Sequence, residues 1–185
     1  MGVDVGELLT ALVRDVPDYP SPGILFKDIT PVLADPGVFA AVVDALVERH
    51  APGTDGSAEG LGKIDKVVGI EARGFILAAP VAYHLRAGFV PMRKKGKLPY
   101  DTYQATYELE YGSATIEVHR DAFRPGERVL VVDDVLATGG TAAAAIDLIQ
   151  QCGARLAGVS FLLELSALHG REKLSGAEVH TLLLV

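Results

Sequence analysis

The sequence of 185 residues contains a single cysteine, Cys152, and no apolar run that approaches the length of about 20 residues needed to span a bilayer. A single cysteine excludes an intrachain disulfide bond. The N-terminus lacks the basic and apolar regions of a secretory signal, so we expect a cytoplasmic protein. The five histidines show no ligand spacing, and we therefore expect no metal site formed by protein side chains alone.

Basic residues are also scarce, because 17 lysines and arginines stand against 24 aspartates and glutamates, for a net charge of −7. Nucleic acids and acidic membranes attract proteins with a cationic face, so neither partner is expected. Hydrophobic residues make up 49% of the chain and charged residues 22%, which is typical of a globular protein and too apolar for a disordered one. We expect one domain over residues 1–185.

Short apolar runs alternate with amphipathic segments along the chain. Strands are predicted at 66–70, 89–92, 128–132, 155–163 and 178–184. Helices are predicted at 3–14, from Asp35 onward, at 74–86 and at 141–151, with Gly153 as a C-terminal cap. Segments 106–111 and 113–119 predict an antiparallel hairpin around Gly112, while 17–23 and 51–63 are predicted to be loops. This alternation predicts an α/β fold with a mainly parallel twisted sheet flanked by helices.

The most informative segment runs from Val129 to Thr141, where a buried strand leads to two adjacent aspartates, a short loop and a helix. The loop ATGGT would present backbone N–H groups at a helix N-terminus, which suits a phosphate. Asp133 and Asp134 would repel a phosphate and should instead accept hydrogen bonds from sugar hydroxyls. A phosphorylated sugar would satisfy both the N–H groups of the loop and the two aspartates. The simpler alternative is an aspartate pair that only caps the helix.

The stretch VLVVDDVLATGGTAAAA resembles the phosphoribosyl-pyrophosphate-binding motif of type I phosphoribosyltransferases. The segments PGILFKDITP, GIEARGF, RKKGKLP, YELEYG and GREKL resemble those of the adenine phosphoribosyltransferases, and they follow the same order from about residue 17 to 175. The resemblance implies a parallel sheet with helices, a small hood over the base at about 1–34, a core at about 35–185 and a flexible β-hairpin loop. It also implies a homodimer.

The activity implied by this resemblance is a pentosyl transfer in purine salvage. Adenine and phosphoribosyl pyrophosphate would give AMP and pyrophosphate, with Mg²⁺ held mainly through substrate oxygens. Two alternatives share the 129–141 motif: a phosphoribosyltransferase for another base, such as xanthine or hypoxanthine, and a regulator that senses phosphoribosyl pyrophosphate. A regulator should add a DNA-binding helix pair and a basic face, which this acidic chain lacks.

The resemblance also assigns residues to roles. Asp133 and Asp134 would hold the ribose hydroxyls, and the 5′-phosphate would bind Ala137, Thr138, Gly139, Gly140 and Thr141. Pyrophosphate would bind Arg73, Arg93, Lys94 and Lys97, with Lys95 left in solvent. Adenine would bind Leu25, Phe26 and Lys27.

Two residues would take part in catalysis. Glu110 would handle a proton near the base or orient its loop, and Arg73 would act beside a non-proline cis peptide bond. Several of these residues could instead have a structural role only. Phe26 could be a core residue, and Glu110 could be an exposed strand residue. Residues 93–97 could be a solvated basic stretch, and Arg73 could pair with Glu71 or another carboxylate.

Overall fold

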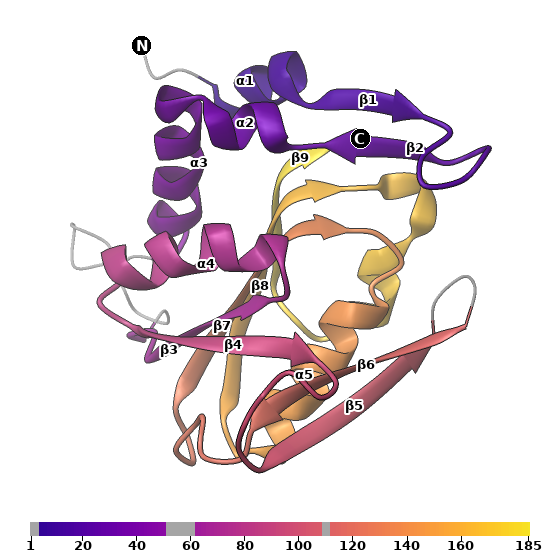
Figure 1. The fold of residues 1–185 in the computed structure, drawn as a ribbon. Coiled ribbons are helices and arrows are strands. Elements are labelled where there is room, and N and C mark those ends of the chain that lie inside the picture. The colour runs from indigo at the N-terminus through magenta and orange to yellow at the C-terminus, as the bar shows by residue number, and fades with distance from the viewer. Residues whose placement is uncertain (1–3, 51–61, 109–111) are drawn as a thin grey trace.

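The computed structural model describes residues 4–50, 62–108 and 112–185 (Figure 1). The helices are α1 (Val5–Leu12), α2 (Thr30–Ala34), α3 (Pro36–Glu48), α4 (Arg73–His84) and α5 (Gly140–Gln151), with short 3₁₀ turns η1 (Ser166–Leu168) and η2 (Gly170–Leu174). The strands are β1 (Arg14–Pro17), β2 (Leu25–Asp28), β3 (Lys66–Ile70), β4 (Gly88–Lys94), β5 (Thr102–Glu108), β6 (Ser113–His119), β7 (Arg128–Leu136), β8 (Arg155–Glu164) and β9 (Val179–Leu184). Within this part of the chain, no helix is both long and apolar enough to cross a membrane.

The described strands form one large sheet and one small sheet. The large sheet has the order β5-β6-β4-β3-β7-β8-β9. Strands β4, β3, β7, β8 and β9 are parallel, whereas β6 pairs antiparallel with both β4 and β5. The predicted mainly parallel sheet is therefore confirmed, and the predicted hairpin is β5–β6. Strands β1 and β2 pair separately as an antiparallel ribbon that extends from the helices (Figure 1).

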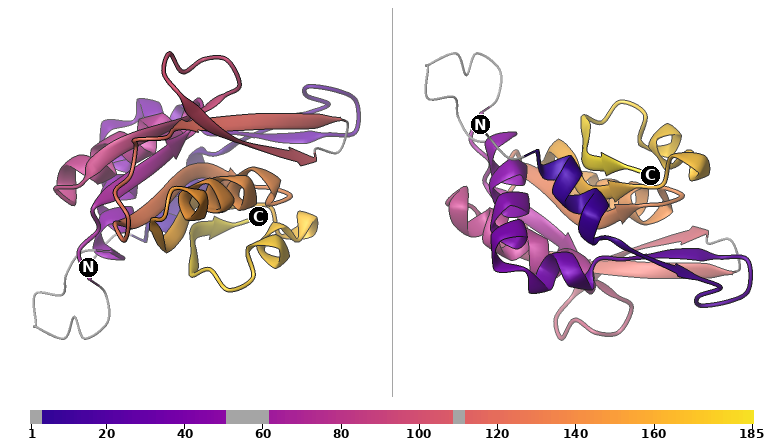
Figure 2. Two further views of the ribbon diagram at one scale, coloured as in Figure 1. Left: turned by 90° about the horizontal axis from the view of Figure 1, so that it is seen from below. Right: turned by 90° about the horizontal axis from the view of Figure 1, so that it is seen from above.

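Helices cover both faces of the large sheet, because alternate residues of each strand point to opposite sides. Val129 and Val131 of β7 pack with α5, while Leu130 and Val132 pack with α1, α3 and α4. The hairpin β5–β6, at one edge of the large sheet, belongs to the first of these cores, so α5 packs against β5 and β6 as well as against β7 and β8 (Figure 2). Burial on both faces explains the uninterrupted apolar run of β7.

Local signals set several boundaries as predicted. The Asp35 side chain accepts hydrogen bonds from the backbone N–H groups of Gly37 and Val38, and Pro36 follows as the first helical residue of α3. Gly153 has a φ of 75°, in the left-handed region where glycine ends helices, and it follows α5 directly.

Two boundaries differ from the prediction. Strand β7 does not end at residue 132 but continues to Leu136, because its pairing with β8 runs as far as Leu136 and Glu164. Asp133 and Asp134 therefore lie within the strand and point to opposite faces of it. Strands β1 and β2 were not predicted, since they are short, contain no buried residue and carry no apolar alternation. The predicted loop at 51–63 falls mainly outside the described residues.

Candidate active site

A cavity of about 340 Å³ opens at the carboxyl ends of the parallel strands, next to the β1–β2 ribbon. In open α/β sheets this edge is where ligands bind. Nine residues predicted from the sequence line it: Leu25, Phe26, Lys27, Arg73, Lys94, Asp133, Asp134, Ala137 and Thr141. An adjoining cavity of about 160 Å³ adds Thr138, Gly139 and Gly140. Residues from four distant parts of the sequence thus meet in one place.

The two aspartates of β7 form the floor of this cavity. Asp134 is only 5% exposed, and its Oδ2 lies 2.5 Å from Nε of Arg73. The backbone N–H of Asp134 donates to Oδ1 of Asp133 at 2.9 Å. Burial, together with the adjacent Asp134 carboxylate, raises the pKa of Asp133, and burial also raises the pKa of Asp134 despite the opposing Arg73 charge. This pair is prepared to accept or share hydrogen bonds with hydroxyl groups of a ligand.

Close packing around Asp133 requires a glycine at the start of α4. A β-carbon added to Gly74 would lie 2.6 Å from Oδ1 of Asp133, well inside the contact distance of real β-carbons. The peptide bond between Glu71 and Ala72, just before this point, is cis, as the resemblance implies. The backbone of the first turn of α4 therefore packs directly against the Asp133 carboxylate.

Arg73 connects two parts of the cavity. Its guanidinium pairs with Asp134 and also lies over the Phe26 ring, with 5.3 Å between Cζ and the ring centroid. The alternative that Arg73 pairs with a carboxylate is confirmed, with Asp134 as the partner in place of Glu71. Because Phe26 belongs to β2 and Asp134 to β7, Arg73 couples the ribbon to the main sheet at the site.

The loop before α5 has the geometry of an anion site. Gly139 adopts a φ of 78° at the helix N-cap, and no side chain caps the helix there. The first N–H groups of α5 are therefore available to a ligand, where the helix dipole favours negative charge. The smaller cavity lies directly against this loop.

An aromatic group forms the opposite end of the cavity. Phe26 packs edge-to-face with Tyr19, with ring centroids 5.2 Å apart. The Lys27 ammonium lies 2.6 Å from Oδ1 of Asp15, within the ribbon. The Lys27 side chain is thus paired with Asp15, and Lys27 lines the cavity beside Leu25.

The predicted basic segment is organised around one carboxylate, Glu71. Its Oε2 accepts from Nε of Arg93 at 3.2 Å and from the backbone N–H of Lys94 at 3.1 Å, and its Oε1 accepts from Nζ of Lys97 at 2.6 Å. These donors, with Lys97 the strongest, lower the pKa of Glu71 to about 2. Arg93 and Lys97 do not line the cavity themselves, but they bind a side chain that does.

A second carboxylate, that of the buried Glu117 of β6, holds the backbone of the same segment. Its Oε1 accepts from the N–H groups of Lys97 and Leu98 at 3.0 and 2.9 Å. Burial raises the pKa of Glu117, but backbone donors at 96–98 outweigh it and leave the pKa below its usual value. The segment 93–98 is therefore fixed both through its side chains and through its backbone.

Some residues that line the 340 Å³ cavity were not predicted from the sequence to belong to the site. They include Ile70, Glu71, Tyr107, Ile116, Val135 and Leu165. Their positions at strand ends could have suggested Ile70 and Glu71, but the apolar members look like ordinary core residues in the sequence. Glu110, the predicted catalytic carboxylate, lies outside the described residues, between β5 and β6.

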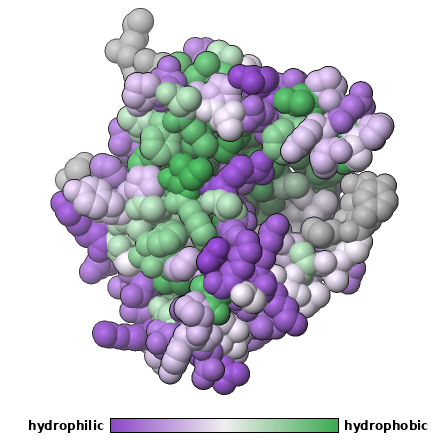
Figure 3. Space-filling view, viewed as in Figure 1, coloured by the Kyte–Doolittle hydropathy of each residue, from purple (hydrophilic) through white to green (hydrophobic). Residues whose placement is uncertain are grey.

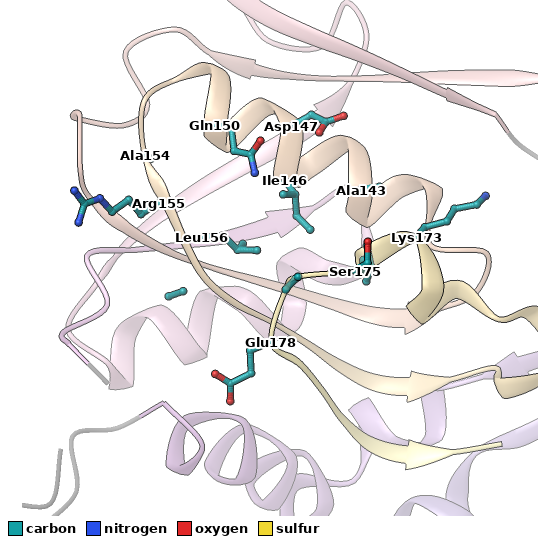
Figure 4. A pocket seen from close by; sticks show the side chains of 14 residues that line it. Ala143, Ile146, Asp147, Gln150, Ala154, Arg155, Leu156, Lys173, Ser175 and Glu178 are labelled. Carbon is teal, nitrogen blue, oxygen red and sulfur yellow. The ribbon is translucent and has the colours of Figure 1, made fainter. Parts of the chain in front are cut away.

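A larger cavity of about 560 Å³ lies between α5, β8 and the segment 173–178 (Figure 4). None of the predicted site residues lines it. Its inner surface contains Ile146 and Leu156, and charged side chains such as Arg155 and Glu178 project from its rim (Figure 4). It lies on the far side of α5 from the sheet-edge site, so it does not take part in the arrangement described above.

Comparison with known proteins agrees with this arrangement. A model of the phosphoribosyl transferase domain matches residues 41–179. The adenine phosphoribosyltransferase of Acidothermus cellulolyticus is 69% identical over 182 residues and covers 98% of each chain. The crystal structure of the Rhodothermus marinus adenine phosphoribosyltransferase is 52% identical, with a TM-score of 0.87 over 98% of both chains.

A further solved structure is from Saccharomyces cerevisiae, an adenine phosphoribosyltransferase complexed with adenine and an imino-altritol bisphosphate. It is 43% identical to this chain, with a TM-score of 0.88 over 96% of this chain and 98% of that one. The likeness extends over nearly the whole chain in both sequence and structure. The protein described here belongs to the adenine phosphoribosyltransferase family.

Proposed function

We propose that this protein transfers the 5-phosphoribosyl group from phosphoribosyl pyrophosphate to adenine, giving AMP and pyrophosphate for purine salvage. The observation that carries this proposal is the order of groups along one cavity: Phe26 at one end, the Asp133–Asp134 pair in the middle and the uncapped N-terminus of α5 beyond it. That order matches a base, a sugar and a phosphate, which are the three parts of AMP.

Each part of the substrate meets a group of suitable chemistry. The 5′-phosphate would accept hydrogen bonds from the loop Ala137–Thr141, which is not closed by a side-chain cap. The ribose hydroxyls would donate to Asp133 and Asp134. Adenine would stack on Phe26 with its edge against the backbone of Leu25 and Lys27. Pyrophosphate would lie beside Arg73 and Lys94, within reach of Arg93 and Lys97.

The reaction forms a bond between an adenine ring nitrogen and the anomeric carbon as the bond from that carbon to the pyrophosphate oxygen breaks. Positive charge would develop on the sugar, and the Asp133–Asp134 pair would stabilise that charge. The proton on the attacking nitrogen must leave, and Glu110 is the candidate to accept it. The negative charge that forms on pyrophosphate is matched by Arg73 and the basic segment.

Mg²⁺ is the expected cofactor, and the residues present fit it. Mg²⁺ prefers oxygen ligands, and it usually combines one or two carboxylates with substrate phosphates and water. The described residues contain no cluster of three or more side chains that would hold a metal by themselves, whereas Asp133 and Asp134 offer carboxylate oxygens at the cavity. Bound Mg²⁺ would supply neutralisation of charge on the pyrophosphate oxygens.

A homodimer is also part of this proposal. Ile76 and Tyr83 of α4 and Phe89 of β4 are 45%, 67% and 39% exposed, and apolar side chains gather over α4 in Figure 3. Exposed apolar surface of this kind commonly marks an interface. Because α4 begins at Arg73, a second copy on this face would sit next to the site. Light scattering of the unaltered chain and of a Tyr83→Glu variant should give a dimer and a monomer, respectively.

The test of the activity is pyrophosphate release with phosphoribosyl pyrophosphate and a panel of acceptor bases. We expect turnover with adenine and little or none with hypoxanthine, guanine, xanthine or uracil. Turnover with hypoxanthine in place of adenine would overturn the base assignment at residues 25–27. Binding of phosphoribosyl pyrophosphate without turnover of any base would instead support a sensor.

A further inference from the structure

The segment Gly170–Leu174, which forms η2, lies outside the roles assigned above, although its sequence GREKL is part of the resemblance to the family. We propose that Arg171 is a positioning residue for the 5′-phosphate loop, holding Gly170 against that loop through an ion pair with the buried Glu164. This inference rests on the proposed function, because it concerns the affinity of the same site for the phosphoribosyl group.

The Arg171 guanidinium is held at three points. Its Nε and Nη2 donate to Oε1 and Oε2 of Glu164 at 3.1 and 2.5 Å, and its Nη1 donates to the carbonyl oxygen of Val179 at 2.8 Å. This two-point contact with a carboxylate is the geometry that only arginine can make. Glu164 is the last residue of β8 and is 7% exposed. The side chain therefore ties η2 to the ends of both β8 and β9.

The residue before Arg171 touches the phosphate loop directly. A β-carbon on Gly170 would overlap the carbonyl oxygen of Ala137 and lie 2.9 Å from the backbone nitrogen of Gly139. A β-carbon on Gly139 would in turn overlap the carbonyl oxygen of Gly170. The two backbones thus pack without side chains between them. Any shift of η2 is transmitted to the loop that receives the 5′-phosphate.

Other contacts keep η2 in the fold when the ion pair is removed. Leu174, at the end of η2, is 3% exposed and belongs to the core beneath α5. The backbone N–H of Leu165 donates to the carbonyl of Leu136 at 2.9 Å, which holds the start of this region to β7. Loss of Arg171 should therefore loosen the position of Gly170 without unfolding the protein.

The direct test measures binding rather than turnover. Titration calorimetry of Arg171→Ala with ribose 5-phosphate should give a dissociation constant about tenfold higher than that of the unaltered chain, or about 1.4 kcal/mol. Adenine binding should not change, because the base end of the cavity is formed by β2. Arg171→Lys keeps the charge but not the two-point contact, and its affinity should lie between the two.

Kinetics and a matched control separate positioning from general damage. The KM for phosphoribosyl pyrophosphate should rise in Arg171→Ala, while kcat at saturation changes less. Lys173→Ala removes an exposed cation from the same turn, one that pairs with no carboxylate among the described residues. It should behave like the unaltered chain. Glu164→Gln should weaken ribose 5-phosphate binding, and combining it with Arg171→Ala should add little.

Two results would overturn the inference. One is an unchanged affinity of Arg171→Ala for ribose 5-phosphate. The other is an equal loss of affinity for adenine and ribose 5-phosphate, which would show only general disturbance of the fold. Failure of the proposed function would look different, because the unaltered chain would then form no AMP from adenine, whatever Arg171 does.

Discussion

The buried histidine His50 should make the stability of this protein depend on pH in a specific window. His50 follows α3, is 7% exposed, and has its Nε2 2.8 Å from the Ser160 hydroxyl. Burial, with a smaller contribution from nearby His180, lowers the pKa of His50 to about 4 from an ordinary value of 6.5. The folded protein therefore resists protonation at a site that the unfolded chain protonates readily.

The sign and size of the effect follow from linkage. Between about pH 6.5 and about pH 4 the unfolded chain binds the extra proton, so the stabilisation is present above about pH 6.5 and is lost as the pH falls. One pKa unit corresponds to about 1.4 kcal/mol. Lowering the pH from about 7.5 to about 5 should therefore reduce the free energy of unfolding by about 2 kcal/mol through His50 alone.

Urea unfolding of the unaltered chain and of His50→Gln at these two pH values tests the prediction. Glutamine can still hydrogen-bond to Ser160 but does not titrate, so the variant should lose about 2 kcal/mol less on acidification. Other groups, including Asp133 with its raised pKa, contribute equally to both proteins. Replacement of the exposed His84 by glutamine serves as the control. Equal losses in the unaltered chain and His50→Gln would refute the reasoning.

Three further changes test the site. Replacing Asp133 and Asp134 together by asparagine should lower kcat by about a hundredfold or more, with circular dichroism unchanged; retained turnover would remove them from the ribose site. Glu71→Gln should raise the KM for pyrophosphate in the reverse reaction by about tenfold, because the half-buried carboxylate that pairs with Arg93 and Lys97 loses its charge; an unchanged or lower KM would contradict this. Gly139→Ala places a β-carbon on a residue with left-handed backbone conformation, which costs about 1–2 kcal/mol of stability. The added β-carbon also clashes with the backbone of Gly170. The melting temperature of this variant should fall by about 5 °C and its KM for phosphoribosyl pyrophosphate should rise.

The main sheet was predictable because its strands are buried on both faces and are therefore uniformly apolar. The run from Val129 to Val132 shows this most clearly, and the caps at Asp35 and Gly153 fixed helix ends by local chemistry alone. The β1–β2 ribbon escaped prediction for the opposite reason. Its residues are exposed or half-buried, and its pairing of Arg14 with Asp28 depends on the turn between the strands rather than on a repeating pattern.

The site was predictable only where its chemistry is local in sequence. The aspartate pair and the loop Ala137–Thr141 lie within one stretch of nine residues, so the sequence alone predicts that they form one site. The contacts of Glu71 with Lys97 and of Glu164 with Arg171 depend on where strands end in the folded sheet. A single sequence does not distinguish such carboxylates from exposed ones, and their role became visible only from their burial and partners.

The net negative charge of the chain is compatible with an anionic ligand because of how these carboxylates are paired. A net charge of −7 predicts poor association with nucleic acid, but it does not describe the potential inside the cavity. Asp134 is buried and Glu71 is half-buried, and they hold Arg73, Arg93 and Lys97 in place before any ligand arrives. Because these long side chains are already ordered, the entropy cost of binding a diphosphate is smaller. In the proposed reaction, carboxylates at this site would therefore favour an anionic substrate by positioning the cations proposed to bind it.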